Sequence, residues 1–179
     1  MKDPHGVSKE RLERLQKAVD ENPESAVAHM KLGTALCWNG VMKRAQQELE
    51  RAIELDESYA EAWVQLGGVR LAVWDFEGCV EANQRAIEIN PEMMQAQYNQ
   101  GLGYLYLNKP AEMVACFRRV LELDPEHPGG HYHLAVGLLA VGEHAEAQTE
   151  LAKAVNLGYA PQPEFVKAMD KAVTGGVTA

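Results

Sequence analysis

The chain has 179 residues, 46% of them hydrophobic, and its 26 acidic and 17 basic side chains give a formal net charge of −9. This negative surplus excludes nucleic acid as a main partner, because phosphate binding needs clustered Lys and Arg. It also does not suit an anionic membrane surface. The longest apolar run, Leu134 to Gly142, is far shorter than the roughly 20 residues that span a bilayer, so we expect no membrane insertion.

The N-terminus and the cysteines indicate the compartment. Residues 1–6 lack the apolar stretch of a secretory signal, so we expect a cytoplasmic protein unless a signal or anchor has been removed. Cys37, Cys79 and Cys116 are odd in number and show no C-x-x-C spacing. This pattern favours buried thiols in a reducing compartment over disulfides or a zinc site.

A first amphipathic helix is predicted at residues 8–25. Leu12, Leu15, Ala18 and Val19 recur at three- and four-residue spacing among many charged residues. This segment matches the second half of the repeated element that follows it, so we interpret it as a half-repeat.

Residues 26–161 repeat with a period of 34 residues. A small residue followed by an aliphatic one recurs in phase, and its first copy lies in the helix at 8–25. The copies are Ala18-Val19, Ala52-Ile53, Ala86-Ile87, Val120-Leu121 and Ala154-Val155. The period divides the segment into four repeats. These are 26–59, 60–93, 94–127 and 128–161.

Each repeat is predicted to contain two helices separated by a turn. The apolar residues of each stretch, such as Ala45, Leu49 and Ala52, form one stripe of an amphipathic helix. Helix breakers interrupt the pattern near the middle of each repeat. They are Asn39-Gly40, Asp75, Asn108 with Pro110, and Gly142.

After the fourth repeat, Pro163 begins a short amphipathic segment with Phe165, Val166 and Met169 on its apolar side. We expect residues 162–174 to form a helix that caps the last repeat, and residues 175–179 to form a disordered tail.

The repeated residues resemble the tetratricopeptide repeat family, whose units carry Leu-Gly or Leu-Ala in the first helix and small residues in the second. Gln100, Arg70, Asn83 and Glu57 depart from the family pattern. The resemblance implies an all-α fold, a single domain formed by a right-handed superhelical solenoid of helix–turn–helix repeats. It also implies residues that pack between helices. These are Leu32, Gly33, Ala45, Ala52, Trp63, Leu66, Gly67, Ala86, Gly101, Tyr104, Phe117, Leu134, Ala135, Ala147 and Ala154.

The resemblance further implies a concave groove lined by the first helix of each repeat, which receives a peptide or helix of a partner protein. Aromatic and amide side chains in such a groove suit a hydrophobic or amphipathic segment. The groove residues implied are Met30, Thr34, Trp38, Gln65, Gln95, Tyr98, Asn99, Leu102, Tyr106, Tyr132 and His133. The Lys and Arg that grip chaperone tails in some family members are absent from the matching places. Leu71, Leu105 and Leu139 also recur in phase, and they either line the groove or pack between helices.

No constellation of catalytic residues is evident, and we expect no enzyme, cofactor or metal site. Gly101-x-Gly103 lies inside a helical stretch, which excludes a phosphate-binding loop. His131 and His133 are two residues apart on a helix, so they point in different directions and cannot share a metal with His127. Acidic pairs such as Glu48 with Glu50, or Glu143 with Glu146, are expected on solvated outer faces.

Two functions remain open. The first is a non-catalytic adaptor that binds a partner segment in the groove and helps a complex to assemble. The second is a self-assembling scaffold that forms homo-oligomers through its terminal helices.

Overall fold

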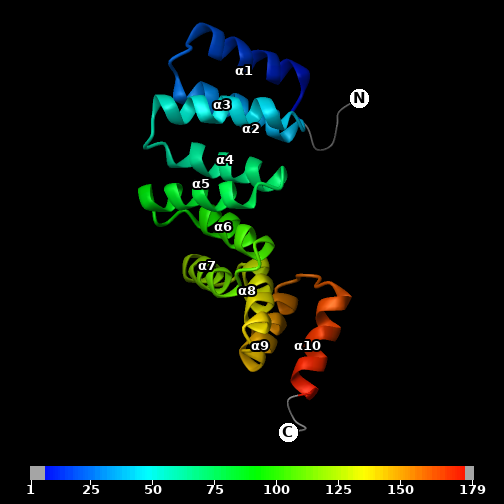
Figure 1. Cartoon of the computed structure of the whole chain (residues 1–179). Helices are drawn as coiled ribbons and strands as arrows, with labels where there is room; N and C mark the ends of the chain where they lie inside the picture. Colours follow the sequence, from blue (N-terminus) through cyan, green and yellow to red (C-terminus); the bar gives the residue numbers. More distant parts are fainter. Residues whose placement is uncertain (1–6, 176–179) are drawn as a thin grey trace. The chain divides into compact units, whose positions relative to one another are not determined.

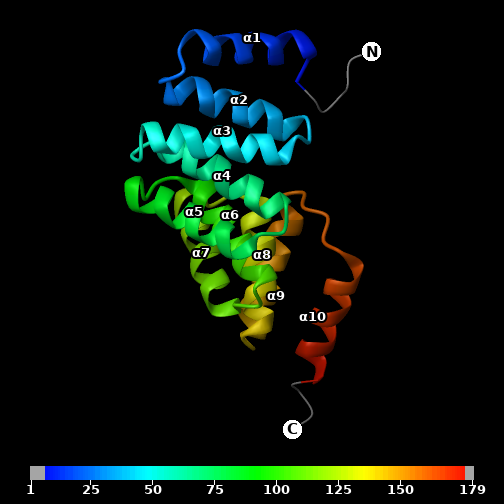
Figure 2. The ribbon, with the colours of Figure 1, turned by 45° about the horizontal axis from the view of Figure 1, so that its top comes forward.

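The computed structural model describes residues 7–175, and within this range the chain forms ten helices and no strand (Figures 1 and 2). The helices are α1 (Lys9–Glu21), α2 (Ala26–Trp38), α3 (Met42–Leu55), α4 (Ala60–Ala72), α5 (Phe76–Ile89), α6 (Met94–Tyr106), α7 (Pro110–Leu123), α8 (Pro128–Ala140), α9 (His144–Asn156) and α10 (Pro163–Gly175). Residues 176–179 of the predicted disordered tail lie outside the described range. Among the described residues, no helix is long and apolar enough to cross a membrane.

Consecutive helices pack against each other in chain order. α2 packs against α3, α4 against α5 and α8 against α9, so these repeats are helix–turn–helix pairs. The half-repeat helix α1 packs on α2. The predicted all-α class of helix–turn–helix repeats is confirmed. The chain divides into two compact bodies within α6: an N-terminal body that ends at Asn99 and a C-terminal body that begins at Gln100.

The two helices of a repeat approach closely because a small residue faces a large one. A Cβ added to Gly33 would lie 2.8 Å from Leu49 Cγ, and one added to Gly101 would lie 2.8 Å from Phe117 Cε2. Such distances are too short for a side chain at either glycine. Overpacking of this kind typically costs about 1–3 kcal/mol. In the fourth repeat the equivalent first-helix residue is Ala135, which is fully buried.

The second repeat places a polar residue in this contact. A Cβ on Gly67 would lie 2.8 Å from Asn83 Cγ, so Asn83 occupies the place of Leu49 and Phe117. Asn83 is fully buried, and its Nδ2 donates to the backbone oxygen of Cys79 at 2.8 Å. Among the described residues its Oδ1 has no hydrogen-bond partner. An unsatisfied buried acceptor costs about 1–3 kcal/mol.

The turn inside each repeat has the same hydrogen bond. The backbone N–H of Val41 donates to the oxygen of Leu36, that of Asp75 to Arg70, that of Lys109 to Tyr104 and that of Glu143 to Leu138, each at 2.9 Å. This six-residue bond is the Schellman closure of a helix C-terminus, which needs a residue in the left-handed region just before the donor. The residues in that place are Gly40 (φ 75°), Trp74 (φ 68°), Asn108 (φ 54°) and Gly142 (φ 85°).

Trp74 is the exception in this series. Glycine adopts a positive φ without steric cost and Asn tolerates it, but a bulky side chain there is strained. Trp74 is also 74% exposed, and its ring meets Phe76 edge-on at a centroid distance of 5.9 Å. The second repeat therefore combines backbone strain with an exposed indole.

Buried apolar side chains follow the helix contacts in each body. The implied packing residues are buried except Trp63 and Tyr104, which are half-buried. The core of the N-terminal body contains Val19, Leu32, Leu36, Ala45, Leu49, Ala52, Ile53, Ala62, Leu66, Val69 and Ala82.

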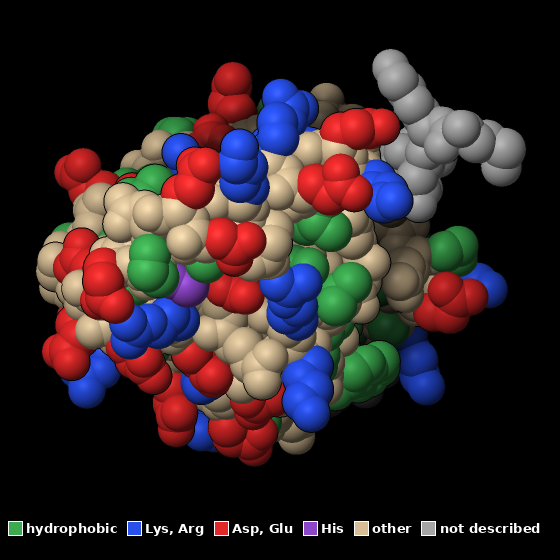
Figure 3. Space-filling view, turned by 90° about the horizontal axis from the view of Figure 1, so that it is seen from above, with side chains coloured by type: hydrophobic (Ala, Val, Ile, Leu, Met, Phe, Trp, Pro, Cys, Tyr) green, Lys and Arg blue, Asp and Glu red, His purple; other side chains and the backbone are tan. Residues whose placement is uncertain are grey.

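The outer faces of the second helices carry paired charges. Arg51 bonds Glu54 at 3.2 Å, and the equivalent pairs Arg85–Glu88 and Arg119–Glu122 lie at 3.0 and 2.8 Å. Acidic and basic side chains intermingle on the face in Figure 3. Exposed pairs of this kind contribute at most about 1 kcal/mol each, so they keep these faces solvated more than they stabilise the fold.

Replacing Asn83 with Leu is expected to raise the free energy of unfolding by about 1 kcal/mol, because the buried unsatisfied oxygen disappears. The carbonyl of Cys79 lies four residues upstream in the same helix, so it keeps its helical acceptor role. Urea unfolding followed by circular dichroism measures the change. The matched control is Leu49→Asn, which creates the same polar contact in the first repeat and should destabilise. A lower stability for Asn83→Leu would contradict the prediction.

Replacing Trp74 with Gly is expected to stabilise the fold by about 0.5–1 kcal/mol, because the left-handed strain is relieved at a position where little packing is lost. Asn108→Gly is the matched control and should change stability less, since Asn already tolerates this backbone. Thermal unfolding of both variants tests the order. A destabilised Trp74→Gly would show that the indole contributes more contact energy than the strain costs.

Candidate peptide-binding surface

The first helix of the first repeat places three implied groove residues four apart on one face of α2. The Thr34 hydroxyl donates to the backbone oxygen of Met30 at 2.9 Å and lies 3.5 Å from the Met30 sulfur. Both side chains are half-buried, whereas Trp38 at the end of the helix is 66% exposed. This face of α2 therefore offers an exposed indole about two helical turns from a half-buried thioether.

Amide side chains gather on α4 and the first half of α6. Gln95 Nε2 donates to Asn99 Oδ1 at 2.8 Å, and the Asn99 backbone oxygen accepts from the Cys79 thiol at 3.4 Å. A Cβ on Gly68 would lie 3.9 Å from Asn99 Nδ2, so α4 and α6 meet through a glycine next to the amide. Gln65 on α4 is half-buried, as is Tyr98 on α6. The hydrogen bond between Gln95 and Asn99 fixes their orientation before any ligand arrives.

In the C-terminal body, Tyr106 and Tyr132 differ sharply in exposure. Tyr106 is 55% exposed at the end of α6, and Leu102, one turn earlier, is half-buried. Tyr132 is only 8% exposed, because the Tyr159 ring stacks on it at 4.5 Å and Phe165 of α10 meets it edge-on at 5.4 Å. Burial raises the pKa of Tyr132, and the nearby Tyr159 adds to this effect. Tyr132 can meet a ligand only if Tyr159 and the Phe165 side chain of α10 both move away.

His133 lies inside the aromatic layer of α8. Its ring stacks on Phe117 at 5.1 Å and meets Tyr132 edge-on at the same distance. Burial and, to a smaller extent, the nearby His127 together lower the pKa of His133 to about 4. The imidazole is therefore neutral at pH 7 and acts as a flat packing group.

His127 and His131, the other two histidines of this segment, each form structural hydrogen bonds. His127 Nδ1 accepts the backbone N–H of Gly130 at 2.9 Å and caps α8. His131 Nε2 donates to the oxygen of Pro125 at 2.9 Å, and its Nδ1 lies 2.5 Å from Glu150. Within the described part of the chain, no group of three or more His, Cys, Asp or Glu could hold a metal ion.

Glu150 completes this buried network. Burial would raise the pKa of Glu150, but hydrogen bonds from Lys153 and His131 outweigh it and lower that pKa. Lys153 Nζ lies 2.7 Å from the carboxylate. Glu150 therefore stays ionised in the fold, as buried carboxylates do when they are paired and hydrogen-bonded.

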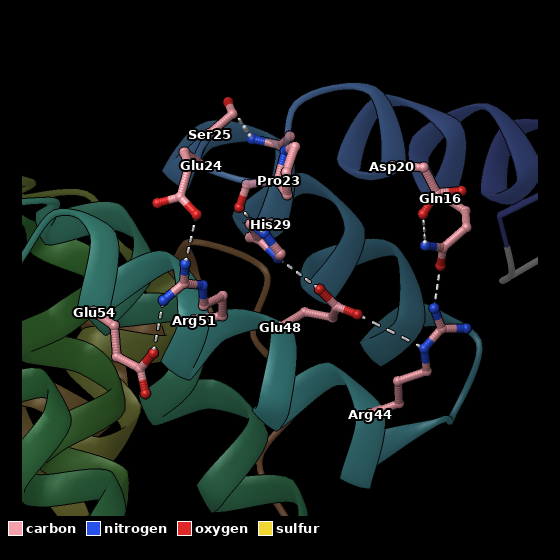
Figure 4. Close-up of polar contacts among 11 residues, drawn as sticks. Gln16, Asp20, Pro23, Glu24, Ser25, His29, Arg44, Glu48, Arg51 and Glu54 are labelled. Atoms are coloured by element: carbon pink, nitrogen blue, oxygen red, sulfur yellow. Dashed lines mark hydrogen bonds and ion pairs between the residues drawn. The ribbon is translucent and has the colours of Figure 1, made fainter.

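The first repeat contains the same arrangement, three repeats earlier in the chain. His29 Nε2 donates to the oxygen of Pro23 at 3.0 Å, and Nδ1 lies 2.8 Å from Glu48. Figure 4 shows His29 between Pro23 and Glu48, with Arg44 on the other side of the carboxylate. The expectation that Glu48 lies on a solvated face is wrong, because its side chain is only 16% exposed against His29.

In the second repeat, the tryptophan Trp63 occupies the place of His29 and His131. Trp63 Nε1 donates to the oxygen of Glu57 at 3.0 Å, which matches the bonds of His29 and His131 to the carbonyl six residues upstream. An indole has one N–H and needs no second acceptor. Accordingly the residue equivalent to Glu48 is Ala82, which is fully buried.

Leu71, Leu105 and Leu139 are all half-buried. They neither lie wholly in the core nor stand open to solvent, so both interpretations of these leucines stay open.

Replacing His133 with Phe is expected to reduce the loss of stability in acid. The folded state holds this imidazole neutral while the unfolded chain protonates near pH 6.5, so its contribution is present above pH 6.5 and is lost as pH falls toward 4. Between pH 7 and 4.5 the wild type should lose about 2 kcal/mol more than the variant. Urea midpoints at both pH values measure this difference, and parallel losses would contradict the assignment.

Comparisons with known proteins support the fold. Residues 95–127 match the family model of the tetratricopeptide repeat. A comparison with curated protein sequences gives no significant match. The structure of MamA residues 41 to the end from Desulfovibrio magneticus RS-1 is 21% identical with a TM-score of 0.76, and the match covers 83% of this chain and 84% of that one.

Two further structures give the same result. A crystal structure of MamA is 22% identical with a TM-score of 0.76, over 82% of this chain and 85% of that chain. A thermophilic TPR protein of Thermus thermophilus is 19% identical with a TM-score of 0.66, over 93% of this chain and 89% of that chain. The family match shows a tetratricopeptide repeat at residues 95–127, and the solved structures show that the chain shares the fold of helix–turn–helix repeat proteins.

Proposed function

We propose that this protein is a non-catalytic adaptor that binds a hydrophobic or amphipathic segment of a partner protein on the faces of its first helices and helps a complex to assemble. One observation carries the proposal: Trp38 and Tyr106 occupy equivalent places two repeats apart, and both aromatic side chains are more than half exposed. In the other two repeats this place holds Ala72 and Ala140. Large exposed aromatic residues are frequent anchors of protein interfaces.

The neighbouring side chains suggest the chemistry of the ligand. Met30 and Leu102 add apolar surface on the same helices as Trp38 and Tyr106. Gln65 and Gln95 add amides that can pair with the backbone of a bound segment, whereas Asn99 is only 8% exposed and serves to orient Gln95. In the N-terminal body the ligand would bury an apolar side chain on Trp38 while its backbone meets the amides, and Tyr106 offers an aromatic anchor on the C-terminal body.

The thiols support a reducing compartment for this adaptor, and with it the cytoplasm. Cys37, Cys79 and Cys116 are all free. Burial raises the pKa of Cys79 to about 11 and that of Cys116 to about 12. Both thiols are therefore protonated and unreactive at neutral pH.

The double substitution Trp38→Ala and Tyr106→Ala is expected to weaken partner binding at least tenfold, because exposed aromatic anchors lose their contact area. The partner is first recovered from an extract of the source cells with the wild-type chain, identified by mass spectrometry and purified. Its affinity for each variant is then measured by calorimetry.

The matched control is Val155→Ala, which removes an exposed aliphatic side chain from the second helix of the last repeat. This variant should bind as the wild type does. Circular dichroism must show equal helicity for all three chains. Unchanged affinity of the double variant would contradict partner binding through these two residues. Sedimentation of the free chain measures its oligomeric state and so distinguishes an adaptor from a self-assembling scaffold.

A further inference from the structure

The last helix, α10, is an amphipathic helix that lies on the fourth repeat. It packs against α9 and α8, and both belong to the same C-terminal body (Figures 1 and 2). Its Met169 is 1% exposed, and Phe165 meets Tyr132 edge-on at 5.4 Å. The backbone of Gln162, just before α10, is hydrogen-bonded to Tyr132. The apolar side of α10 thus covers the aromatic face of α8.

The face under α10 belongs to a series of helix-binding faces. In the N-terminal body, Val64 is the residue equivalent to Tyr132, and it is 3% exposed. Val64 packs in a cluster with Ala86 and with Ala96 of α6, the first helix of the next repeat. α10 therefore takes the place that the first helix of a following repeat would take. The face of α8 and α9 is shaped to receive a helix.

The contact of α10 with this face is small. Among its described side chains only Met169 is fully buried, while Phe165 and Val166 are half-buried and the charged residues are exposed. The segment that leads into α10 turns at Gly158, which has a φ of 87°. Terminal elements with few buried apolar contacts open at low free energy. α10 can therefore leave its face without unfolding the repeats beneath it.

We propose that the face of α8 and α9 is a docking site for an amphipathic helix of a partner protein, and that α10 is the resident helix which the partner displaces. The inference rests on the proposed adaptor function and names the ligand of its C-terminal part. The partner helix carries the pattern that α10 presents: an aromatic residue, an aliphatic residue next to it, and a flexible apolar residue four places after the aromatic one. These side chains meet Tyr132 and the site of Met169.

Because α10 must leave before a partner helix can bind, the chain limits access to its own docking site. Only the fraction of molecules with α10 released can bind a partner helix, so the apparent affinity is lower than the intrinsic one by that fraction. A partner must therefore match the pattern of Phe165 and Met169 better than α10 does, or be present at high concentration.

The probe for the test is a fluorescein-labelled peptide with the sequence of residues 163–175, titrated into the full chain and followed by fluorescence anisotropy. The chain with Met169→Glu should bind the peptide at least tenfold tighter than the wild type, because its own α10 no longer competes. Lys167→Glu changes an exposed residue of α10 and should bind as the wild type does. Adding Tyr132→Ala to Met169→Glu should abolish the gain.

Equal peptide affinity for the wild type and Met169→Glu overturns the proposal, and so does a gain that survives Tyr132→Ala. Phe165→Ala weakens the same contact more mildly and serves if Met169→Glu does not fold. Dissociation of a wild-type oligomer by the peptide, seen in sedimentation, would show that a second copy of this chain supplies the helix, which also overturns it. Partner binding through Trp38 and Tyr106 is tested by a different double variant. A negative result for the α8 and α9 face therefore does not contradict the adaptor function.

Discussion

The close contact between a small residue of the first helix and a large side chain of the second is the constraint on which the rest of the structure depends. Gly33 on Leu49, Gly67 on Asn83 and Gly101 on Phe117 bring two helix backbones together at the same place in successive repeats. Because this distance is fixed, the turn that joins the helices is fixed as well, and all four turns close with the same hydrogen bond. The contact is local, so its loss affects one pair and its neighbours first.

The fold could be predicted from the sequence because its determinants are short-range. Three- and four-residue spacing predicts each helix, Gly40 and Gly142 mark turns, and Asn83 is visible as a departure from the apolar series before any coordinates. The candidate surface could be predicted only in part. Trp38 and Tyr106 are exposed, but the burial of Tyr132 depends on where α10 lies, and the spacing of residues within one helix carries no information about which other helix covers it.

The paired His29–Glu48 and His131–Glu150 contacts show what sequence reasoning missed and how it could have been found. Each pair joins the two helices of one repeat, and the two pairs are in phase. The second repeat replaces both members together, with Trp63 and Ala82. A comparison of the repeats column by column would show this joint change. The physical reason is the number of ring nitrogens, since a buried imidazole has a second nitrogen that needs a polar partner and an indole does not.

The distribution of the aromatic residues gives the two bodies different optical signals. All three tryptophans, Trp38, Trp63 and Trp74, lie before Asn99, whereas four of the six tyrosines follow it. Indole emission therefore reports on the N-terminal body alone, and Trp63, with its N–H bound to a carbonyl, is the indole whose surroundings change most when that body opens. Tyrosine absorbance reports mainly on the C-terminal body. A single chain thus carries a separate spectroscopic reporter for each half, and non-coincident transitions would reveal whether the halves melt as one cooperative unit.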